Sequence, residues 1–239
     1  MNFEEIQING HAGTLHLRLW SPSVKPRALV LILHGYAEYG GRYAHVAEAL
    51  VKNGLAVLAP DHVGHGLSEG ERALITDFGL VVDDIEATAT AASEHLSDRL
   101  PLILVGHSMG GHGAITIALK NQEKYRSVSA FAPIASPMNC PWGIKAFRNY
   151  LGDEINDWLE YDSSELIKTS QTSIPLKIDQ GSADQFLKDQ LKPELLLQAA
   201  EEKNFPVIYN LREGYDHSYF FISSYIENHL KFHAKYLVI

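Results

Sequence analysis

The residues best suited to chemistry lie in one short stretch, residues 101–111, which reads P-L-I-L-V-G-H-S-M-G-G. The apolar run 102–105 predicts a buried strand, and A-I-T-I-A-L after the glycines predicts a helix. Between them stands G-H-S-M-G, which has the G-x-S-x-G spacing of a nucleophile elbow. A serine at such a turn needs a strained backbone, and side chains at the two glycines would collide there. Ser108 is therefore the predicted nucleophile, with the N-terminal end of the following helix directed at the reacting oxygen.

The elements that must position this serine alternate along the chain. We expect strands at 4–8 and 14–20 (an edge hairpin), 28–33, 55–59, 102–105, 127–131, 174–178 and 206–211. We expect helices at 43–53, 78–96 (with Asp77 as its cap), 114–119, 194–203 and 218–236. This alternation predicts an α/β fold, with a mostly parallel sheet covered by helices on both faces, in a single domain over residues 1–239.

Residues 132–173 form the least periodic part of the chain and hold Pro133, Pro137, Pro141 and Gly143. Short helical pieces are predicted at 145–150 and 153–161. We expect a compact excursion over one end of the sheet here.

The partners of Ser108 should lie at the carboxyl ends of other parallel strands, where functional groups gather in open sheets. D-Q-G-S-A-D-Q-F follows one such strand, and R-E-G-Y-D-H-S-Y follows the last one. An acid and His217 then succeed the serine in the order nucleophile, acid, histidine. Asp179 and Asp184 compete for the role of acid. Asp184 is favoured because its loop must reach toward His217, whereas Asp216 is ranked as a surface or structural group.

These roles define an acyl-enzyme mechanism that needs no cofactor. His217 would take the proton of Ser108 as its hydroxyl attacks a carbonyl, then return it to the leaving group, while the acid fixes the imidazole tautomer. The oxyanion hole needs two backbone amides. We expect one from Met109, directly after the nucleophile, and the other from Tyr36, in the loop after the first buried strand.

Other reactive side chains have a structural explanation beside a chemical one. For four histidines the structural explanation is preferred: His34, His62, His65 and His107. Cys140 is either a reactive thiol near the site or an inert small residue. Two groups of aromatic side chains would line an acyl pocket or pack in the core: Trp142, and the cluster Tyr215, Tyr219, Phe220 and Phe221.

Composition excludes several classes of function. A net charge of -9, from 20 basic and 29 acidic residues, argues against nucleic acid or an anionic membrane as partner. One cysteine allows no intrachain disulfide and no cysteine metal site, and the twelve histidines show no H-E-x-x-H pattern, so no metal is expected. The first residues are not those of a signal peptide, and no apolar run approaches the roughly 18 to 20 residues that span a bilayer, so we expect a cytoplasmic protein.

Two family resemblances follow from longer motifs. Residues 28–108 resemble monoacylglycerol lipases through H-G-Y-A-E-Y-G-G-R-Y, A-P-D-H-V-G-H-G-L-S-E-G-E-R and D-F-G-L-V-V-D-D. From Gly106 onward the chain resembles S-formylglutathione hydrolase through G-H-S-M-G-G-H-G-A, Y-R-S-V-S-A-F-A-P-I, P-W-G-I-K-A-F, I-D-Q-G-S-A-D-Q-F-L and E-G-Y-D-H-S-Y-F-F-I. Both are α/β-hydrolases, which implies that fold. The pair predicts a mosaic of a lipase-like half, 1–105, and a hydrolase-like half, 106–239.

Each resemblance implies part of the site. The hydrolase resemblance implies the triad of Ser108, Asp184 and His217. The lipase resemblance implies the Tyr36 amide for the oxyanion hole. It also implies polar contacts to a glycerol head group from Glu38 and Arg42, for which a solvated salt bridge is the alternative. The helical cap of the lipases is replaced by a shorter excursion, and the N-terminal half that completes a glutathione pocket is missing.

The sequence therefore predicts a serine carboxylesterase for small or medium acyl esters, with Trp142 as a candidate substrate contact. The alternatives are a thioesterase acting on S-formylglutathione and, third, a monoacylglycerol lipase. The non-enzymatic alternative is a catalytically incompetent scaffold.

Overall fold

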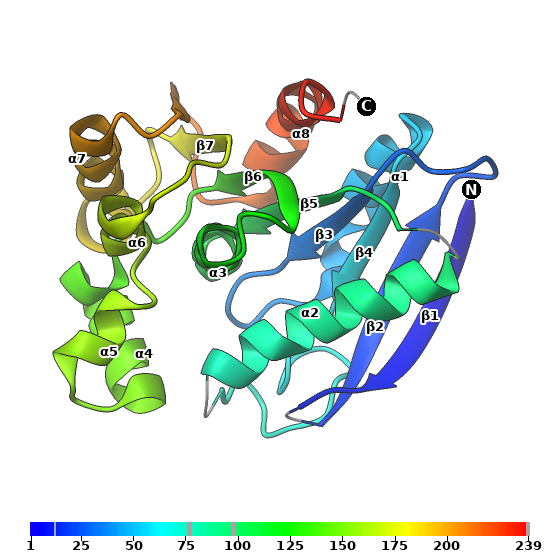
Figure 1. Ribbon diagram of the computed structural model, residues 1–239, viewed down its shortest axis with the longest axis horizontal. Helices are drawn as coiled ribbons and strands as arrows, with labels where there is room; N and C mark the ends of the chain where they lie inside the picture. The colour runs from blue at the N-terminus through cyan, green and yellow to red at the C-terminus, as the bar shows by residue number, and fades with distance from the viewer. Residues whose placement is uncertain (12, 76–77, 97–98, 238–239) are drawn as a thin grey trace.

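A computed structural model describes residues 1–11, 13–75, 78–96 and 99–237 (Figure 1). Its strands form one eight-stranded sheet in the order β1-β2-β4-β3-β5-β6-β7-β8. They are β1 (Asn2–Asn9), β2 (Thr14–Ser21), β3 (Leu29–Leu33), β4 (Ala56–Pro60), β5 (Leu102–His107), β6 (Tyr125–Phe131), β7 (Leu176–Gly181) and β8 (Val207–Arg212). β2 runs antiparallel to both β1 and β4, and the other pairs are parallel. The predicted edge hairpin and parallel sheet are confirmed.

The helices follow the strands as predicted, with additions between β6 and β8. They are α1 (Ala44–Lys52), α2 (Phe78–His95), α3 (Met109–Lys120), α4 (Pro141–Leu151), α5 (Ile155–Leu159), α6 (Ser163–Thr169), α7 (Pro193–Lys203) and α8 (Tyr219–Ala234). Short 3₁₀-helices, η1 (Gly40–Tyr43) and η2 (Pro137–Asn139), and a π-helical segment, η3 (Leu187–Leu191), complete the set. Asp77, expected to cap α2, lies outside the described residues.

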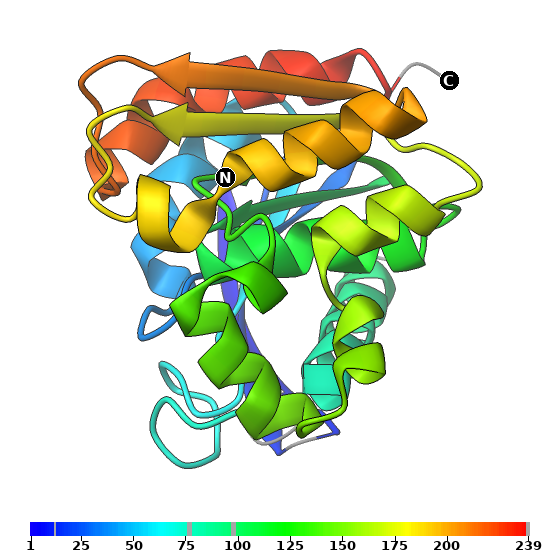
Figure 2. The same cartoon turned by 90° about the vertical axis from the view of Figure 1, so that its left-hand side faces the viewer.

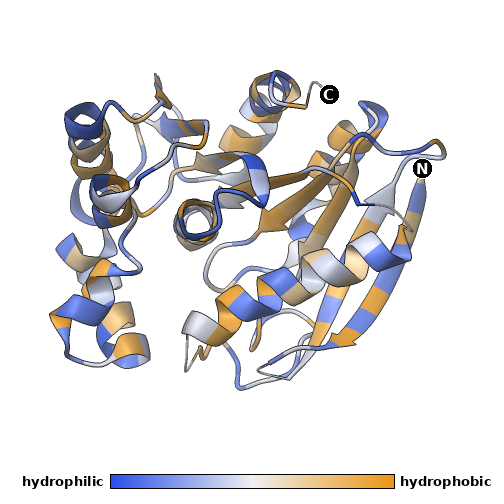
Figure 3. Cartoon of the chain, in the orientation of Figure 1, coloured by the Kyte–Doolittle hydropathy of each residue, from blue (hydrophilic) through white to orange (hydrophobic). Residues whose placement is uncertain are grey.

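Helices cover both faces of the sheet (Figure 1). Apolar residues of α2, α3, α6 and α7 pack in one core cluster, and those of α1 and α8 pack in a second cluster on the opposite face. β3 is buried along its whole length and uniformly apolar, whereas the edge strand β1 alternates between polar and apolar residues (Figure 3). Because β3, β5, β7 and β8 run parallel, their carboxyl ends lie along one edge of the sheet.

The excursion between β6 and β7 contains α4, α5 and α6, and Figure 2 shows α4 (green) and α5 (yellow-green) farther from β7 and β8 than α6 is. α6 was not predicted, because seven residues are too few to show a helical repeat. The Asp162 carboxylate caps this helix by accepting hydrogen bonds from the Ser164 and Glu165 amides. Among the described residues, no helix is long and apolar enough to cross a membrane.

Eight of the described histidines are buried, and burial keeps several of them neutral. Burial lowers the pKa of His34, His112 and His229 to about 4. Burial also holds the pKa of His62 and of His233 well below the ordinary value. An unfolded chain protonates these side chains near pH 6.5, at a higher pH than the folded chain does. The folded state therefore binds fewer protons in acid and loses stability as the pH falls.

We accordingly expect the free energy of unfolding to fall steeply from about pH 6.5 toward pH 4. His233 lies between the hydroxyls of Ser127 and Ser129, at 2.7 and 2.9 Å from its ring nitrogens. Replacing it in His233→Asn should reduce the slope by about 1.4 kcal/mol per pH unit, because one proton difference is removed. Urea unfolding at a series of pH values measures the slope. The exposed His11→Asn is the control, and an equal slope in all three proteins would contradict the assignment.

Candidate active site

Ser108 occupies a strained turn between β5 and α3, with φ 54° and ψ -119°. Its amide donates to the Phe131 carbonyl at 3.0 Å, which ties the turn to β6. A Cβ on Gly106 would collide with the Gly110 carbonyl, and one on Gly110 would collide with the last carbonyls of β3 and the residue after it. The elbow geometry predicted from the G-x-S-x-G spacing is therefore present, and both glycines are required sterically.

His217 and Asp184 form a short hydrogen bond. His217 Nδ1 lies 2.6 Å from Asp184 Oδ2, and the carboxylate side chain is fully buried. Asp184 also accepts from Gln180 Nε2 at 3.1 Å and from the Phe186 amide at 2.8 Å. Because an ionised carboxylate only accepts hydrogen bonds, Nδ1 carries the proton and Nε2 is left to accept one. This is the orientation that a general base needs.

The loops after β7 and β8 pack together and hold this pair. The Ser182 amide donates to the Arg212 carbonyl at 2.9 Å, and the Ala183 amide donates to the Tyr215 carbonyl at 3.0 Å. A Cβ on Gly181 would collide with the same Tyr215 carbonyl. Close backbone contact thus sets the distance between the segments that carry the acid and the histidine.

The pair lies beside the elbow. The rings of His217 and His107 are 4.6 Å apart between centroids, and His107 directly precedes Ser108. Within the part of the chain that the structure describes, Ser108 Oγ makes no hydrogen bond, either to His217 or to another group. In structures without substrate, catalytic hydrogen bonds are often long and close only in the complex. The three residues are brought to one place with the serine–histidine contact open.

The other candidate acid, Asp179, has a different set of partners. It bonds Lys177 and Arg212 at 2.7 and 2.6 Å and accepts from Asn210 Nδ2 at 2.9 Å. Burial alone would raise its pKa, but His229 and Lys177 outweigh that effect and hold the pKa well below its usual range. Asp179 is therefore part of a buried ion network between β7 and β8, with the neutral His229 of α8 3.5 Å away. It does not contact His217.

The two amides expected to form an oxyanion hole are both unpaired. Neither the Tyr36 nor the Met109 amide donates to a group among the described residues. Met109 begins α3, and the next residue, Gly110, packs against the carbonyls at the end of β3, close to Tyr36 in the chain. The arrangement leaves both amides able to donate to a developing oxyanion.

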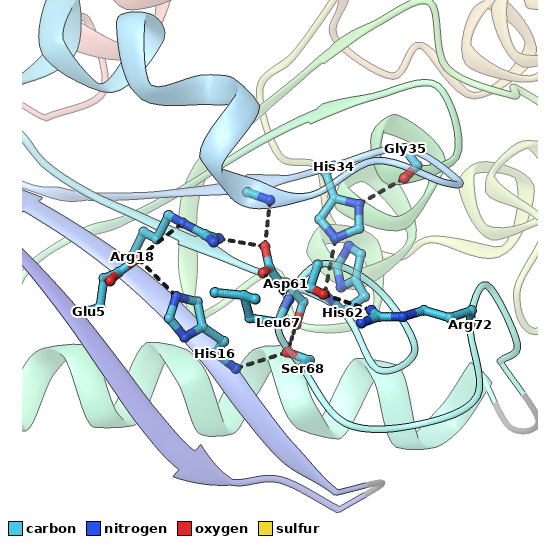
Figure 4. Close-up of polar contacts among 12 residues, drawn as sticks. Glu5, His16, Arg18, His34, Gly35, Asp61, His62, Leu67, Ser68 and Arg72 are labelled. Carbon is cyan, nitrogen blue, oxygen red and sulfur yellow. Dashed lines mark hydrogen bonds and ion pairs between the residues drawn. The ribbon is translucent and has the colours of Figure 1, made fainter.

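The loop of residues 61–70 wraps around one buried carboxylate (Figure 4). Asp61 Oδ1 accepts from Arg18 at 2.6 Å and from the Gly40 amide at 2.7 Å, and Oδ2 accepts from the Leu67 amide at 2.8 Å. A Cβ on Gly66 would collide with this carboxylate. Asp61 therefore ties the glycine-rich loop to β2 and to η1, beside the segment that carries Tyr36. Sequence reasoning did not single out this aspartate.

The histidines near these loops have the structural roles expected of them. His34 is fully buried, and its Nδ1 bonds the Gly35 carbonyl at 2.8 Å while Nε2 accepts from the His62 amide at 3.0 Å (Figure 4). The rings of His34 and His62 are 4.1 Å apart, and His65 bonds the Val63 carbonyl at 2.9 Å. Within the described residues, no group of three or more His, Cys, Asp or Glu side chains is placed to hold a metal ion.

Two of the predicted substrate contacts, Glu38 and Arg42, lie next to each other. Glu38 is largely buried, and its Oε1 lies 3.6 Å from Arg42, whose side chain is about half-exposed at 45%. Glu38 Oε2 accepts from the Gly35 amide at 3.0 Å and from the Tyr43 hydroxyl at 2.9 Å. The carboxylate is thus bonded within the protein, while Arg42 keeps much of its surface in solvent.

The third predicted contact, Trp142, is separated from His217 by the ring of Phe186. Trp142 is 42% exposed and lies 4.6 Å from Phe186, which meets His217 edge-on at 5.2 Å. The two aromatic residues form a wall beside the pair of His217 and Asp184. Phe186 was not predicted, although it stands two residues after Asp184 in a motif that sequence analysis quoted.

Cys140 and one member of the last aromatic cluster, Phe221, pack in the core. Cys140 is fully buried at the start of α4, and burial raises the pKa of its thiol. Phe221 is buried against Phe131 at 5.5 Å, and Tyr215 stacks on Phe220 at 5.9 Å. Phe221 is therefore a core residue, whereas Phe220 is 70% exposed on α8.

The sheet order, the elbow and the pair of His217 and Asp184 define an α/β-hydrolase. Comparison with known proteins agrees, because residues 24–205 match the serine aminopeptidase S33 family. S-formylglutathione hydrolase from Rattus norvegicus is 42% identical over 212 residues, covering 80% of this chain and 75% of the rat protein. The chain belongs to the serine aminopeptidase S33 family, whose match covers more than half of its length.

Solved structures show the same fold. An S-formylglutathione hydrolase from Agrobacterium tumefaciens superimposes with a TM-score of 0.84 and 28% identity, covering 100% of both chains. A soluble variant of monoglyceride lipase from Saccharomyces cerevisiae, in complex with a substrate analogue, has a TM-score of 0.76 at 16% identity. That match covers 100% of this chain and 96% of the yeast chain, and it carries the fold alone.

The two aspartates of the β7 region should respond differently to substitution. Asp184→Asn should lower kcat by about 10⁴-fold with the protein still folded, because an amide at this position favours the wrong histidine tautomer. Asp179→Asn should lower the free energy of unfolding by about 3 kcal/mol or more, because Lys177 and Arg212 lose a buried counter-charge. Ester hydrolysis and urea unfolding measure the two effects. A larger loss of kcat in folded Asp179→Asn than in Asp184→Asn would reverse the assignment of the acid.

Proposed function

We propose that this chain is a serine esterase that hydrolyses carboxylic esters with small or medium acyl groups. The observation that carries the proposal is the strained Ser108 elbow beside the buried hydrogen bond between His217 and Asp184. The family assignment supports the same class of reaction. A small-molecule ester is the substrate class, and the reaction uses no cofactor.

Each group then has one task. Ser108 Oγ attacks the ester carbonyl carbon while His217 Nε2 takes its proton, and Asp184 stabilises the resulting imidazolium. The amides of Tyr36 and Met109 donate to the oxyanion of the tetrahedral intermediate. The alcohol leaves with the proton from His217, and a water activated by the same nitrogen releases the acid from the acyl-enzyme.

An apolar cluster next to the nucleophile supports acyl groups larger than formyl. Met109 and Tyr150 pack against three buried side chains of the loop after β4 and of α2, namely Val63, Ile75 and Val81. Met109 and Tyr150 are half-buried, so each keeps apolar surface that a short acyl chain can cover. At about 25 cal/mol per Å², each methylene buried there would contribute under 1 kcal/mol, which favours a graded preference over a sharp one.

A thioesterase that acts on S-formylglutathione is the second candidate. It is supported by the rat relative and by the wall formed by Trp142 and Phe186. A monoacylglycerol lipase is third. The partly exposed Arg42 guanidinium supports it, but Glu38 already has protein partners.

The organisation of the chain also remains a proposal. We propose one domain over residues 1–239, which the single eight-stranded sheet supports, and a cytoplasmic location. The two sets of motifs support a mosaic joined near Gly106, of residues 1–105 and 106–239. The family match spans residues 24–205 and so lies on both sides of that position. Descent of the whole chain from one ancestor is the alternative to a mosaic.

Ser108→Ala tests the nucleophile. We expect loss of turnover on the order of 10⁶-fold, because the remaining oxyanion donors and binding contacts supply little without it. A fluorophosphonate probe should label the wild type and not the variant. Ser224→Ala, at an exposed serine of α8, is the matched control and should label normally. Turnover of a tenth or more in Ser108→Ala would exclude the mechanism.

The same probe separates an enzyme from a non-catalytic scaffold. The open contact between Ser108 and His217 is the feature that favours a scaffold, because an uncoupled serine is a weak nucleophile. A folded wild-type protein that the probe fails to label would establish the scaffold.

Chain-length preference tests the substrate class. We expect p-nitrophenyl acetate and butyrate to be turned over well, with kcat/KM falling for long chains because the helical cap of the lipases is replaced by α4, α5 and α6. Steady-state kinetics on esters of increasing length, with S-formylglutathione in parallel, measure it. If S-formylglutathione is hydrolysed orders of magnitude faster than every p-nitrophenyl ester, the second candidate replaces the first.

A further inference from the structure

One buried carboxylate connects the two segments that carry the oxyanion amides. Glu38 has a side chain only 13% exposed, and its Oε2 accepts hydrogen bonds from the Gly35 amide at 3.0 Å and the Tyr43 hydroxyl at 2.9 Å. Its Oε1 lies 3.7 Å from His107 Nδ1, in the elbow. Gly35 precedes Tyr36 in the chain, as His107 lies two residues before Met109. Glu38 therefore contacts both sides of the predicted oxyanion hole.

The turn that presents the Tyr36 amide is strained and needs such support. Ala37 adopts φ 58°, a left-handed conformation that L side chains disfavour. The turn is closed by the Glu38 amide, which donates to the Gly35 carbonyl at 3.3 Å, and by the carboxylate, which accepts from the Gly35 amide. A residue in this region of φ costs about 1 kcal/mol or more and persists only where its surroundings impose it.

Neighbouring groups contact the turn on two sides. A Cβ on Gly35 would lie 3.4 Å from both the Glu38 carboxylate and the His107 carbonyl. Tyr43, the other partner of Glu38, packs its ring edge-on against that of Tyr219, with the ring centroids 5.2 Å apart. Tyr219 follows His217 by two residues in the chain. The same contacts thus extend from the oxyanion turn to the start of α8.

The charge of Glu38 suits this role. Burial would raise its pKa, but the contacts with His107, the Gly35 amide and the Tyr43 hydroxyl outweigh burial and lower the pKa to about 2. The side chain is ionised at neutral pH and accepts hydrogen bonds from the Gly35 amide and the Tyr43 hydroxyl, while its other oxygen lies 3.7 Å from His107 Nδ1. Charge-assisted hydrogen bonds of this kind are stronger than neutral ones.

We infer that Glu38 is a positioning residue, which holds the Tyr36 amide in register with the Met109 amide over Ser108. The inference rests on the proposed function, because an oxyanion hole serves only a chain that performs acyl transfer. It differs from the role that the lipase resemblance implies, in which this carboxylate contacts the glycerol head group. A positioning role affects the transition state of every ester, and a glycerol contact affects only glycerol esters.

The test compares four variants on p-nitrophenyl butyrate and on glycerol monobutyrate, with binding of a trifluoromethyl ketone as a mimic of the tetrahedral adduct. Glu38→Ala should lower kcat by about 10²-fold on both esters with little change in KM, and ketone affinity should fall in parallel. Glu38→Asp keeps the charge but is too short to reach the Gly35 amide and His107 together, so it should show the same pattern. Glu38→Gln keeps an acceptor oxygen at the right length without the charge, so it should retain more of kcat than Glu38→Asp but less than the wild type. Glu48→Ala, at an exposed glutamate of α1, is the control.

The outcomes separate three roles. A rise in KM on the glycerol ester alone, with kcat unchanged, would overturn the inference in favour of a substrate contact. Unchanged kcat and ketone affinity in Glu38→Asp, with a lower melting temperature, would reduce Glu38 to a structural residue. If Glu38→Ala does not fold, Glu38→Asp and Glu38→Gln still decide between these roles. An inactive and unlabelled wild type would refute the proposed function instead, and that result is read before any variant is made.

Discussion

The close approach of three backbone segments at the elbow is the constraint on which the rest of the site depends. Ser108 holds φ 54° because the chain must reverse within one residue between a buried strand and a helix. Gly106 and Gly110 supply the clearance, and the second of them also packs on the end of β3. Strain of this kind costs free energy and is maintained by the surrounding packing. The buried strands on either side of β5 provide that packing.

The ends of the parallel strands determine where the predicted catalytic residues lie. β5, β7 and β8 are parallel and nearly adjacent, so the loops that leave them meet at one edge of the sheet. Two aspartates five residues apart illustrate the consequence. Asp179 ends β7 among cations and is held by Lys177 and Arg212, whereas Asp184 lies in the loop beyond and reaches His217. Their chemical difference comes from the partners and not from the residue type.

Much of the fold was predictable because its signals are local. Continuous apolar runs identified the buried strands, alternation identified the edge hairpin, and the G-x-S-x-G spacing identified the strained turn. The triad residues were named from strand order, and the structure brings them together. The catalytic roles themselves stay predictions until they are tested. Short elements such as α6 were missed, because seven residues contain too little periodicity.

What sequence could not provide were partners distant in the chain. Asp61 and its contacts with Arg18 and Gly40 leave no local pattern, since the bonded groups are about 20 to 40 residues apart. Phe186 ends the D-Q-G-S-A-D-Q-F motif, but its contact with His217 depends on how two loops pack. For Glu38 the lipase resemblance implied a contact with a glycerol head group, with a solvated salt bridge as the alternative, and its bonds with Gly35 and Tyr43 depend on how the loop folds back on itself. These are effects of tertiary packing, which no window of sequence records.

The contact between Gly110 and the end of β3 has a consequence for recombination. It joins residues on opposite sides of position 106, where two sets of motifs meet, and it leaves room for a hydrogen atom but not for a methyl group. An exchange of N-terminal halves among relatives would therefore succeed only if the incoming β3 places its last carbonyls at the same distance from Gly110 of α3. A strand one residue longer would push the nucleophile out of line, however well each half folds. Modularity in this fold is limited less by the cores of the two halves than by a single backbone clearance between them.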